Sequence, residues 1–249
     1  MADRFDPRTT ERLRAGSINA QPGSVGSTAT DAGLRSYMLS IYNYMTSGIL
    51  LTGVVALLFA QSGMALQIMG GPGLMKYVII FSPLVIVFAM SFGMQKFSTA
   101  TLQAMFWGFA LLMGLSMSTI FLVYTGQSIA LAFFSTAAAF AGLSLFGYTT
   151  KKDLTGWGSF LIMGVVGLIV ASILNIFLKS SVMGLVISYA AVLIFAGLTA
   201  YDTQRLKSTY AYVAGTDMMG KVVIMGALSL YLNFINMFQA LLSIMGSRD

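Results

Sequence analysis

Long apolar stretches separated by short polar breaks dominate the chain from about residue 40 onward. Seven of them occur, each of roughly 20 residues, at residues 44–62, 77–94, 102–124, 129–148, 158–178, 183–203 and 222–245. A helix of about 20 residues crosses about 30 Å of hydrocarbon and satisfies its own backbone hydrogen bonds there. The pattern therefore predicts an all-α integral membrane protein with seven transmembrane helices. Six spans is the alternative, if the third and fourth stretches are divided wrongly.

The overall composition agrees with a chain that lies mostly in lipid. Of its 249 residues, 57% are hydrophobic and 9% are charged, against about 25% charged in an ordinary soluble domain. The mean hydropathy of +0.83 is too high for one buried core or one signal peptide to explain. The absence of cysteine and histidine excludes disulfides, Cys/His zinc sites and catalysis by an imidazole base. We therefore expect neither an enzyme nor a cofactor.

The N-terminal segment differs from the rest of the chain. Residues 1–35 hold nine of the 22 charges and are otherwise rich in Ser, Thr, Gly and Ala. Such a segment has too little apolar surface to offset the entropy lost on ordering. It also lacks the apolar core of a signal peptide. We expect residues 1–35 to be a flexible cytoplasmic tail and residues 36–249 to form the seven-helix transmembrane domain.

The positions of the basic residues predict the orientation in the membrane. With seven spans, the N-terminal side holds eleven basic residues: Arg4, Arg8, Arg12, Arg14, Arg35, Lys96, Lys151, Lys152, Arg205, Lys207 and Lys221. The opposite side holds only Lys76, Lys179 and Arg248. Loops rich in Lys and Arg stay in the cytoplasm. The N-terminus is expected inside the cell and the C-terminus outside. The net charge of +6 then reflects topology and not nucleic-acid binding.

Asp202 is the acidic residue that most needs an explanation. Only four acids follow residue 35, and it alone lies at the end of an apolar span. An ionisable group there marks an ion or proton pathway by default, because burying an unpaired carboxylate is costly. The alternative is a structural ion pair with Arg205, one turn further along the same helix. Lys207 and Lys96 are two further cations that could serve as its partner.

The seventh span carries a polar stripe that is expected to lie near Asp202. Ser229, Asn233 and Asn236 recur at helical spacing on one face. If Gly215 ends the sixth helix and Thr216 or Asp217 caps the seventh, the two form an antiparallel hairpin. Asp202 and Asn233 would then lie roughly 20 Å and 27 Å from the turn, within about one helical turn of each other. The simpler alternative for the stripe is hydrogen bonding between helices.

At these residues the sequence resembles the Bax inhibitor-1 family of small seven-span membrane proteins. The likeness rests on FAGLTAYDTQR at residues 195–205 and GALSLYLNFIN at residues 226–236. GLSMS at 114–118 and FGYTTKKDL at 146–154 add to it. The resemblance extends over roughly residues 36–246 and leaves the N-terminal tail outside. It implies a seven-helix fold in which the C-terminal helix is central and the other six surround it.

The resemblance also implies a function. Bacterial members are associated with a pH-sensitive calcium leak, and the family with stress protection and inhibition of cell death. The family's pH sensor is an aspartate pair, of which the first matches Asp202 and the second matches position 233, where this chain has Asn. Two facing carboxylates can share a proton, whereas an amide cannot titrate. Calcium affinity also falls with the number of charged ligands, so Asp202 alone would be a weak calcium ligand.

Two functions therefore stay open at the level of sequence. The first is a low-flux calcium or cation leak in stress homeostasis, with Asp202 as the charged gate and Ser229, Asn233 and Asn236 as neutral lining. The second is a non-conducting modulator of other membrane proteins or of membrane proteolysis. An intramembrane enzyme is not expected, because a serine protease of the rhomboid kind needs His and an aspartyl protease needs two intramembrane acids.

Overall fold

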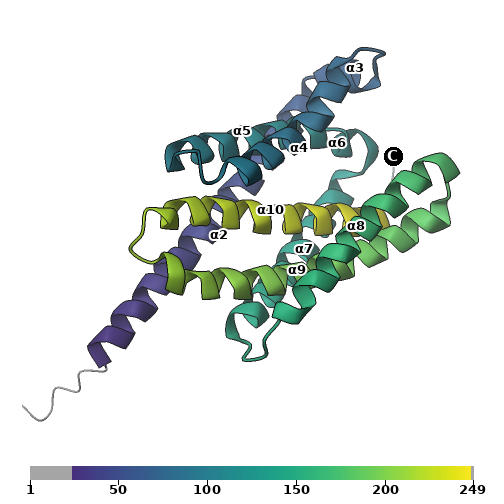
Figure 1. The fold of residues 1–249 in the computed structure, drawn as a ribbon. Coiled ribbons are helices and arrows are strands. Elements are labelled where there is room, and N and C mark those ends of the chain that lie inside the picture. The colour runs from purple at the N-terminus through teal and green to yellow at the C-terminus, as the bar shows by residue number, and fades with distance from the viewer. Residues whose placement is uncertain (1–23, 248–249) are drawn as a thin grey trace, which may run out of the picture.

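The computed structural model describes residues 24–247, with side chains from residue 31, and this part of the chain forms helices joined by short turns (Figure 1). The helices are α2 (Ser24–Gln61), α3 (Met64–Gly70), α4 (Met75–Gly93), α5 (Thr99–Met117), α6 (Ile120–Val123), α7 (Gly126–Thr149), α8 (Thr155–Leu178), α9 (Ser181–Val213) and α10 (Met218–Met245).

Seven of these segments are long and apolar enough to cross a membrane, which confirms the predicted count. The third span runs from Thr99 to Val123 and contains both α5 and the short α6. Ser118 interrupts it, where the side chain donates to the Leu115 carbonyl at 2.7 Å. The third and fourth stretches are thus separate spans, and the six-span alternative is wrong. The short α3 lies in the connection between the first two spans, where only a turn was expected.

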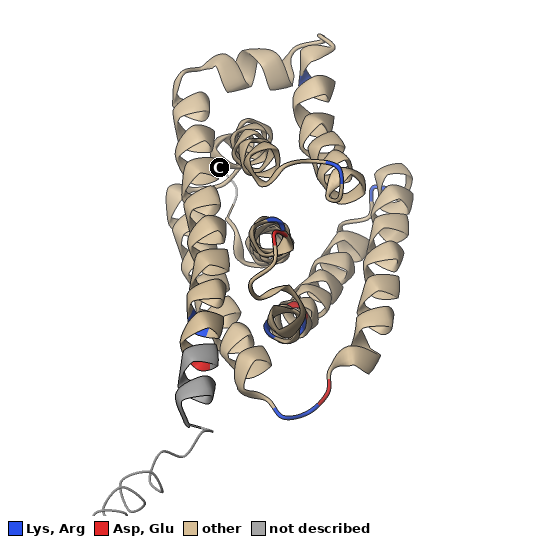
Figure 2. Ribbon diagram, turned by 60° about the vertical axis from the view of Figure 1, so that its left-hand side comes forward, with Lys and Arg blue, Asp and Glu red and all other residues tan. Residues whose placement is uncertain are grey.

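The C-terminal helix α10 is the centre of the bundle, as the family resemblance implied. Figure 2 looks nearly along this helix, with the other long helices around it. Fully 56% of its most apolar window is buried, whereas no other span exceeds 33%. At its middle, the Tyr231 hydroxyl lies 2.6 Å from Thr52 Oγ1 of α2, which donates to the Ala110 carbonyl of α5 at 2.7 Å. This buried chain of hydrogen bonds fixes α10 against two of its neighbours.

The first helix begins earlier than the sequence suggested. Residues 24–35 were assigned to the flexible tail but form the start of α2. The physical reason is a contact with α9, which also extends beyond its apolar stretch and ends at Val213. The rings of Tyr37 on α2 and Tyr210 on α9 pack with their centroids 5.3 Å apart. The two extensions thus support each other. Residues 1–23 lie outside the described residues, so for them the tail stays a prediction.

The turn between α9 and α10 has the expected form. The helix α9 ends at Val213. Gly215 then adopts a positive φ of 74°, a conformation that glycine reaches without steric cost. Asp217 occupies the N-cap position of α10, although its side chain makes no capping hydrogen bond. The two helices therefore form the antiparallel hairpin that brings Asp202 and the polar stripe together.

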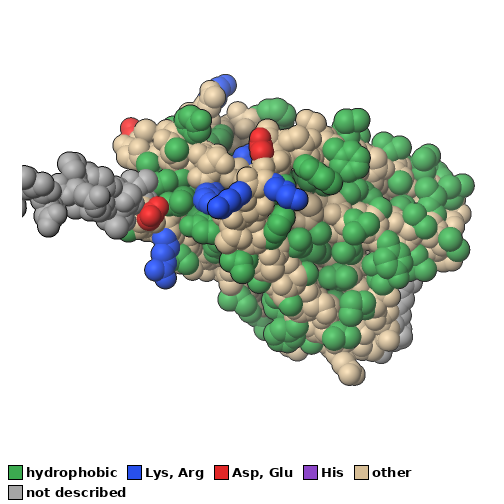
Figure 3. Space-filling view, turned by 90° about the horizontal axis from the view of Figure 1, so that it is seen from below, with side chains coloured by type: hydrophobic (Ala, Val, Ile, Leu, Met, Phe, Trp, Pro, Cys, Tyr) green, Lys and Arg blue, Asp and Glu red, His purple; other side chains and the backbone are tan. Residues whose placement is uncertain are grey.

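The outer surface divides into an apolar body and a charged end. In Figure 3 the charged side chains gather towards the end where α2 begins, and hydrophobic side chains cover much of the remaining face. Exposed large apolar residues are especially dense on α8, of whose most apolar window only 6% is buried. A surface of this kind matches lipid and not water.

Candidate functional site

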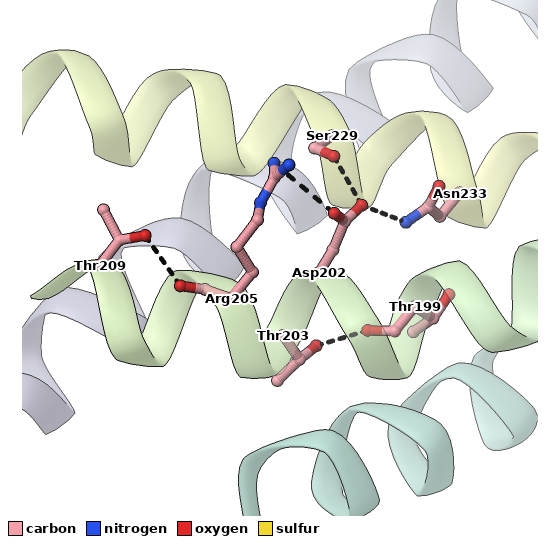
Figure 4. A network of polar contacts seen from close by, with 7 residues as sticks. All are labelled: Thr199, Asp202, Thr203, Arg205, Thr209, Ser229 and Asn233. Atoms are coloured by element: carbon pink, nitrogen blue, oxygen red, sulfur yellow. Dashed lines mark hydrogen bonds and ion pairs between the residues drawn. The ribbon is translucent and has the colours of Figure 1, made fainter. Parts of the chain in front are cut away.

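Asp202 projects from α9 towards α10 and is held there by the polar stripe. Its Oδ2 accepts hydrogen bonds from Ser229 Oγ at 2.7 Å and from Asn233 Nδ2 at 2.8 Å (Figure 4). The residue is only 5% exposed, so the surrounding protein buries it. The predicted meeting of Asp202 with Asn233 is confirmed, and Ser229 joins them. Both neighbours donate to the same carboxyl oxygen of Asp202.

Of the three cations considered as partners, Arg205 is the one that contacts Asp202. Its Nη2 lies 3.6 Å from Asp202 Oδ1, and its side chain is 52% exposed. Lys207 instead donates from Nζ to the Tyr148 carbonyl of α7 at 2.8 Å, and Lys96 is exposed in the turn between α4 and α5. An ion pair of this length with a half-exposed partner contributes at most about 1 kcal/mol, so it can open readily.

Polar contacts on the opposite face of α9 fix the direction in which Asp202 points. Thr203 Oγ1 lies 2.9 Å from Ser144 Oγ of α7, which in turn lies 3.0 Å from the Tyr42 hydroxyl of α2. Gln204 holds the turn between α7 and α8: its Nε2 donates to the Lys152 carbonyl at 2.7 Å, and its Oε1 accepts from the Leu154 amide at 2.8 Å. Because α9 is anchored on this side, Asp202 is held on the side of α10.

The turn that Gln204 holds is itself braced. Asp153 Oδ1 accepts from the Thr155 amide at 2.9 Å at the start of α8. Hydrogen bonds from the Thr155 side chain and backbone lower the pKa of the Asp153 carboxyl below its ordinary value. This carboxylate is fully exposed and belongs to the turn, and it takes no part in the Asp202 network.

The polar stripe of α10 faces a cleft as well as Asp202. A central cleft of about 910 Å³ runs between α4, α5, α8, α9 and α10. Its lining includes Asp202, Arg205 and the predicted stripe of Ser229, Asn233 and Asn236, together with Gln239. Asn236 does not bond to Asp202, because its Nδ2 donates to the Leu232 carbonyl of its own helix at 2.7 Å. Asn236 is therefore lining only.

Two smaller cavities continue the central cleft towards the two ends of α10. The first, here called the Ser91 cavity, has about 450 Å³ and shares Arg205 and Ser229 with the cleft. The second, the Tyr124 cavity, has about 230 Å³ and shares Ser116 and Gln239 with it. Residues of α10 from Val222 to Leu242 line the cleft and the two cavities, over a length of roughly 30 Å at 1.5 Å per residue. That length equals the thickness of a bilayer's hydrocarbon core.

Comparison with known proteins agrees with this architecture. The family model described as "Inhibitor of apoptosis-promoting Bax1" matches residues 34–249. The chain belongs to the Bax inhibitor-1 family. An uncharacterized protein of Caulobacter vibrioides is 48% identical over 90% of this chain and 94% of its own length. The inner membrane protein YbhL of Escherichia coli K12 is 42% identical over 87% of this chain and 94% of its own length. An uncharacterized membrane protein of Streptococcus pyogenes shares 35% identity over 89% and 97%.

Within the Bax inhibitor-1 family, this chain presents one carboxylate where the resemblance implied two. Among the described residues, no three acidic side chains gather in a way that could hold a metal ion. The central cleft offers one carboxylate with amide and hydroxyl groups around it. Such a site can attract a cation in transit, but it has few charged oxygens with which to retain calcium.

Several residues of the site were not found from the sequence. Ser91 and Ser116 line the cavities, and Ser144 and Gln204 orient α9. Ser116, Gln204 and the 146–154 turn lie inside the motifs that carry the family resemblance, which was the available signal. Ser144 pairs with Thr203 and Gln204 with Leu154, and each pair is 50 or more residues apart in the chain, so spacing alone could not pair them.

Proposed function

We propose that this Bax inhibitor-1 family protein is a low-flux cation leak of the bacterial cytoplasmic membrane, with calcium as the permeant ion and a role in stress homeostasis. The observation that carries the proposal is the row of three cavities along α10, which meets the only buried carboxylate of the described residues at Asp202. A negative charge in a low-dielectric cleft concentrates cations.

Arg205 is the gate in this proposal. It lines both the Ser91 cavity and the central cleft, and it pairs with Asp202 at their junction. While the pair is closed, the positive guanidinium repels a cation that approaches from the Ser91 cavity. Opening the pair exposes the carboxylate, and Ser229 and Asn233 keep it in place. The weakness of the pair explains how a leak can be slow without being shut.

The proposal includes an orientation. The N-terminus lies in the cytoplasm and the C-terminus outside it, as the eleven basic residues on one side and three on the other predict. The name of YbhL supports the inner membrane as the location. Asp202 and the Ser91 cavity then belong to the cytoplasmic half of the pathway.

Calcium flux from proteoliposomes tests the proposal. In Asp202→Asn the cleft loses its carboxylate and keeps the positive Arg205, so we expect the flux to fall at least about tenfold. A loss of about 1.4 kcal/mol in the attraction between the cleft and the cation corresponds to a factor of ten in rate. Asp217→Asn is the matched control, because Asp217 is exposed in the turn before α10. Flux no greater than that of empty liposomes would reject the leak.

One observation favours the second candidate, a non-conducting modulator of other membrane proteins or of membrane proteolysis. The donors on Asp202 all come from this chain, so the network could serve only to hold α9 against α10. This function predicts a membrane protein or protease that co-purifies with the chain equally well after Asp202→Asn, together with no flux from the parent.

A further inference from the structure

A second large hollow lies between α2 and α7, apart from the polar cleft. This α2–α7 groove has a volume of about 780 Å³. Large apolar side chains such as Met38, Ile49 and Phe133 form most of its wall, and the small side chains of Ala137 and Ala141 leave the space open along α7. None of its lining residues contacts Asp202 directly, although Ser144 and Tyr42, which anchor α9 through Thr203, and Phe234 of α10 form part of the wall.

The dimensions of the groove fit a single hydrocarbon chain. On α2 it extends from Arg35 to Leu50 and on α7 from Phe133 to Tyr148, in each case about 22 Å of helix at 1.5 Å per residue. Its wall is mostly apolar along this length, so it offers a hydrocarbon chain contact from end to end. The length exceeds the roughly 15 Å of hydrocarbon in one leaflet, so an acyl chain can lie in it along its whole length.

The charged end of the groove determines which lipid it suits. Arg35 closes this end on α2; its side chain is exposed, and among residues 31–247 it forms no ion pair. Tyr148 closes the same end on α7. The Nζ atom of Lys207 lies over the Tyr148 ring, 4.8 Å from its centroid. Lys151 and Lys152 follow Tyr148 within one turn of chain. Asp31, one turn before Arg35, is not part of the lining.

We propose that the α2–α7 groove binds one acyl chain of an anionic phospholipid, with the lipid phosphate on Arg35. The apolar wall supplies the binding of the chain, since each buried methylene contributes about 0.8 kcal/mol. The guanidinium supplies a planar set of donors for the phosphate oxygens, and the lysines at this end favour a headgroup that is negative overall. The site is independent of ion conduction.

Photo-crosslinking tests the proposal on the full chain in liposomes. Two lipids carry the same diazirine on an acyl chain, one a phosphatidylglycerol and the other a phosphatidylcholine. We expect phosphatidylglycerol to label peptides from residues 38–50 and 133–145 several-fold more than phosphatidylcholine does. Arg35→Gln should reduce this labelling about fivefold, as the loss of about 1 kcal/mol per cation near the lipid surface implies. Lys179→Gln, exposed at the opposite end of the bundle and outside the lining, should change it little.

A second pair of variants tests the space itself. Ala141→Trp places a large ring inside the groove and should abolish the labelling of both segments. Ala138→Trp is the matched control, because Ala138 is exposed on α7 and outside the lining. Equal labelling by the two lipids overturns the assignment to an anionic lipid, and labelling that survives Ala141→Trp overturns the groove as the site. The comparison of lipids on the parent needs no variant to fold.

Discussion

Asp202, Arg205 and Asn233 form a site with a single negative charge that is neutralised within the chain. The sequence left three cations open as the partner of Asp202, and in the structure Arg205 lies on the same side of α9 as Asp202 while Lys207 turns to α7. Lys96 comes from a different part of the chain, so only the packed bundle could remove it from consideration. The choice among the three cations was therefore partly local and partly tertiary.

Replacing Asn233 by Asp tests what the missing second carboxylate would add. In Asn233→Asp a carboxyl group takes the place of an amide whose nitrogen lies 2.8 Å from Asp202 Oδ2. Two carboxylates this close share a proton until the pH is high enough to ionise both. We expect calcium flux that rises with pH as the pair ionises, measured in the same liposomes, because the second negative charge attracts cations and pushes the pair apart.

Asn236→Asp is the control for this experiment. Asn236 lines the same cleft one turn further along α10 but bonds to the Leu232 carbonyl and not to Asp202. Its replacement adds the same charge without creating a facing pair. A pH profile of Asn233→Asp that matches those of the parent and of Asn236→Asp would show that position 233 is not a place for a sensor.

At the scale of the helices, close approach of α7 to α9 sets the position of the site. Gly147 lies so near the Ala200 carbonyl oxygen that a methyl group in its place would collide with the backbone of α9. Backbone cannot move aside as the end of a flexible side chain can. The same contact region holds the Ser144–Thr203 and Gln204 hydrogen bonds. The sequence motifs at 146–154 and 195–205 are thus the two sides of one helix interface.

A pair of glycine substitutions measures this contact. We expect Gly147→Ala to lower stability by about 1–3 kcal/mol, because overpacking forces the helices apart. Gly142→Ala on the same helix has open space and should be neutral or stabilising by up to about 1 kcal/mol, since Ala favours helix more than Gly does. Thermal unfolding in detergent distinguishes the two variants, with the loss of the monodisperse peak in size-exclusion chromatography as the measure of unfolding. Equal melting temperatures of the two variants would mean that α7 and α9 are not in close contact.

For the whole molecule, the described ends of the chain lie at opposite ends of the bundle, as seven spans require. The C-terminal end is fixed beside the start of α7, where the Thr125 amide donates to the Ser247 carbonyl at 3.3 Å and the Ser247 amide to Ser128 Oγ at 2.9 Å. Most of the basic side chains in this view gather at the other end, where α2 begins (Figure 3). The long helices therefore run from one face of the bilayer to the other.

The orientation of the molecule in the membrane is directly testable, because the chain has no cysteine of its own. We expect a single cysteine from Lys152→Cys to react with a membrane-impermeant maleimide only after the cells are opened. A single cysteine from Gly73→Cys, in the turn before α4, should react in intact cells. Both positions are exposed. The reverse pattern would place the N-terminus outside and the Ser91 cavity on the outer side.

The sequence alone determined the number of spans, the central place of the last helix through the family resemblance, and the identity of Asp202 as the isolated acid. The number of spans and the isolation of Asp202 follow from properties that are local along the chain, namely apolar length and scarcity of charge, whereas the central helix is what the family resemblance implied. The tertiary structure decided the remainder, namely that Arg205 pairs with Asp202, that three cavities follow α10, and that α2 begins at Ser24 against α9. Each of these depends on contacts between distant segments, whose free energy exists only once the helices have packed.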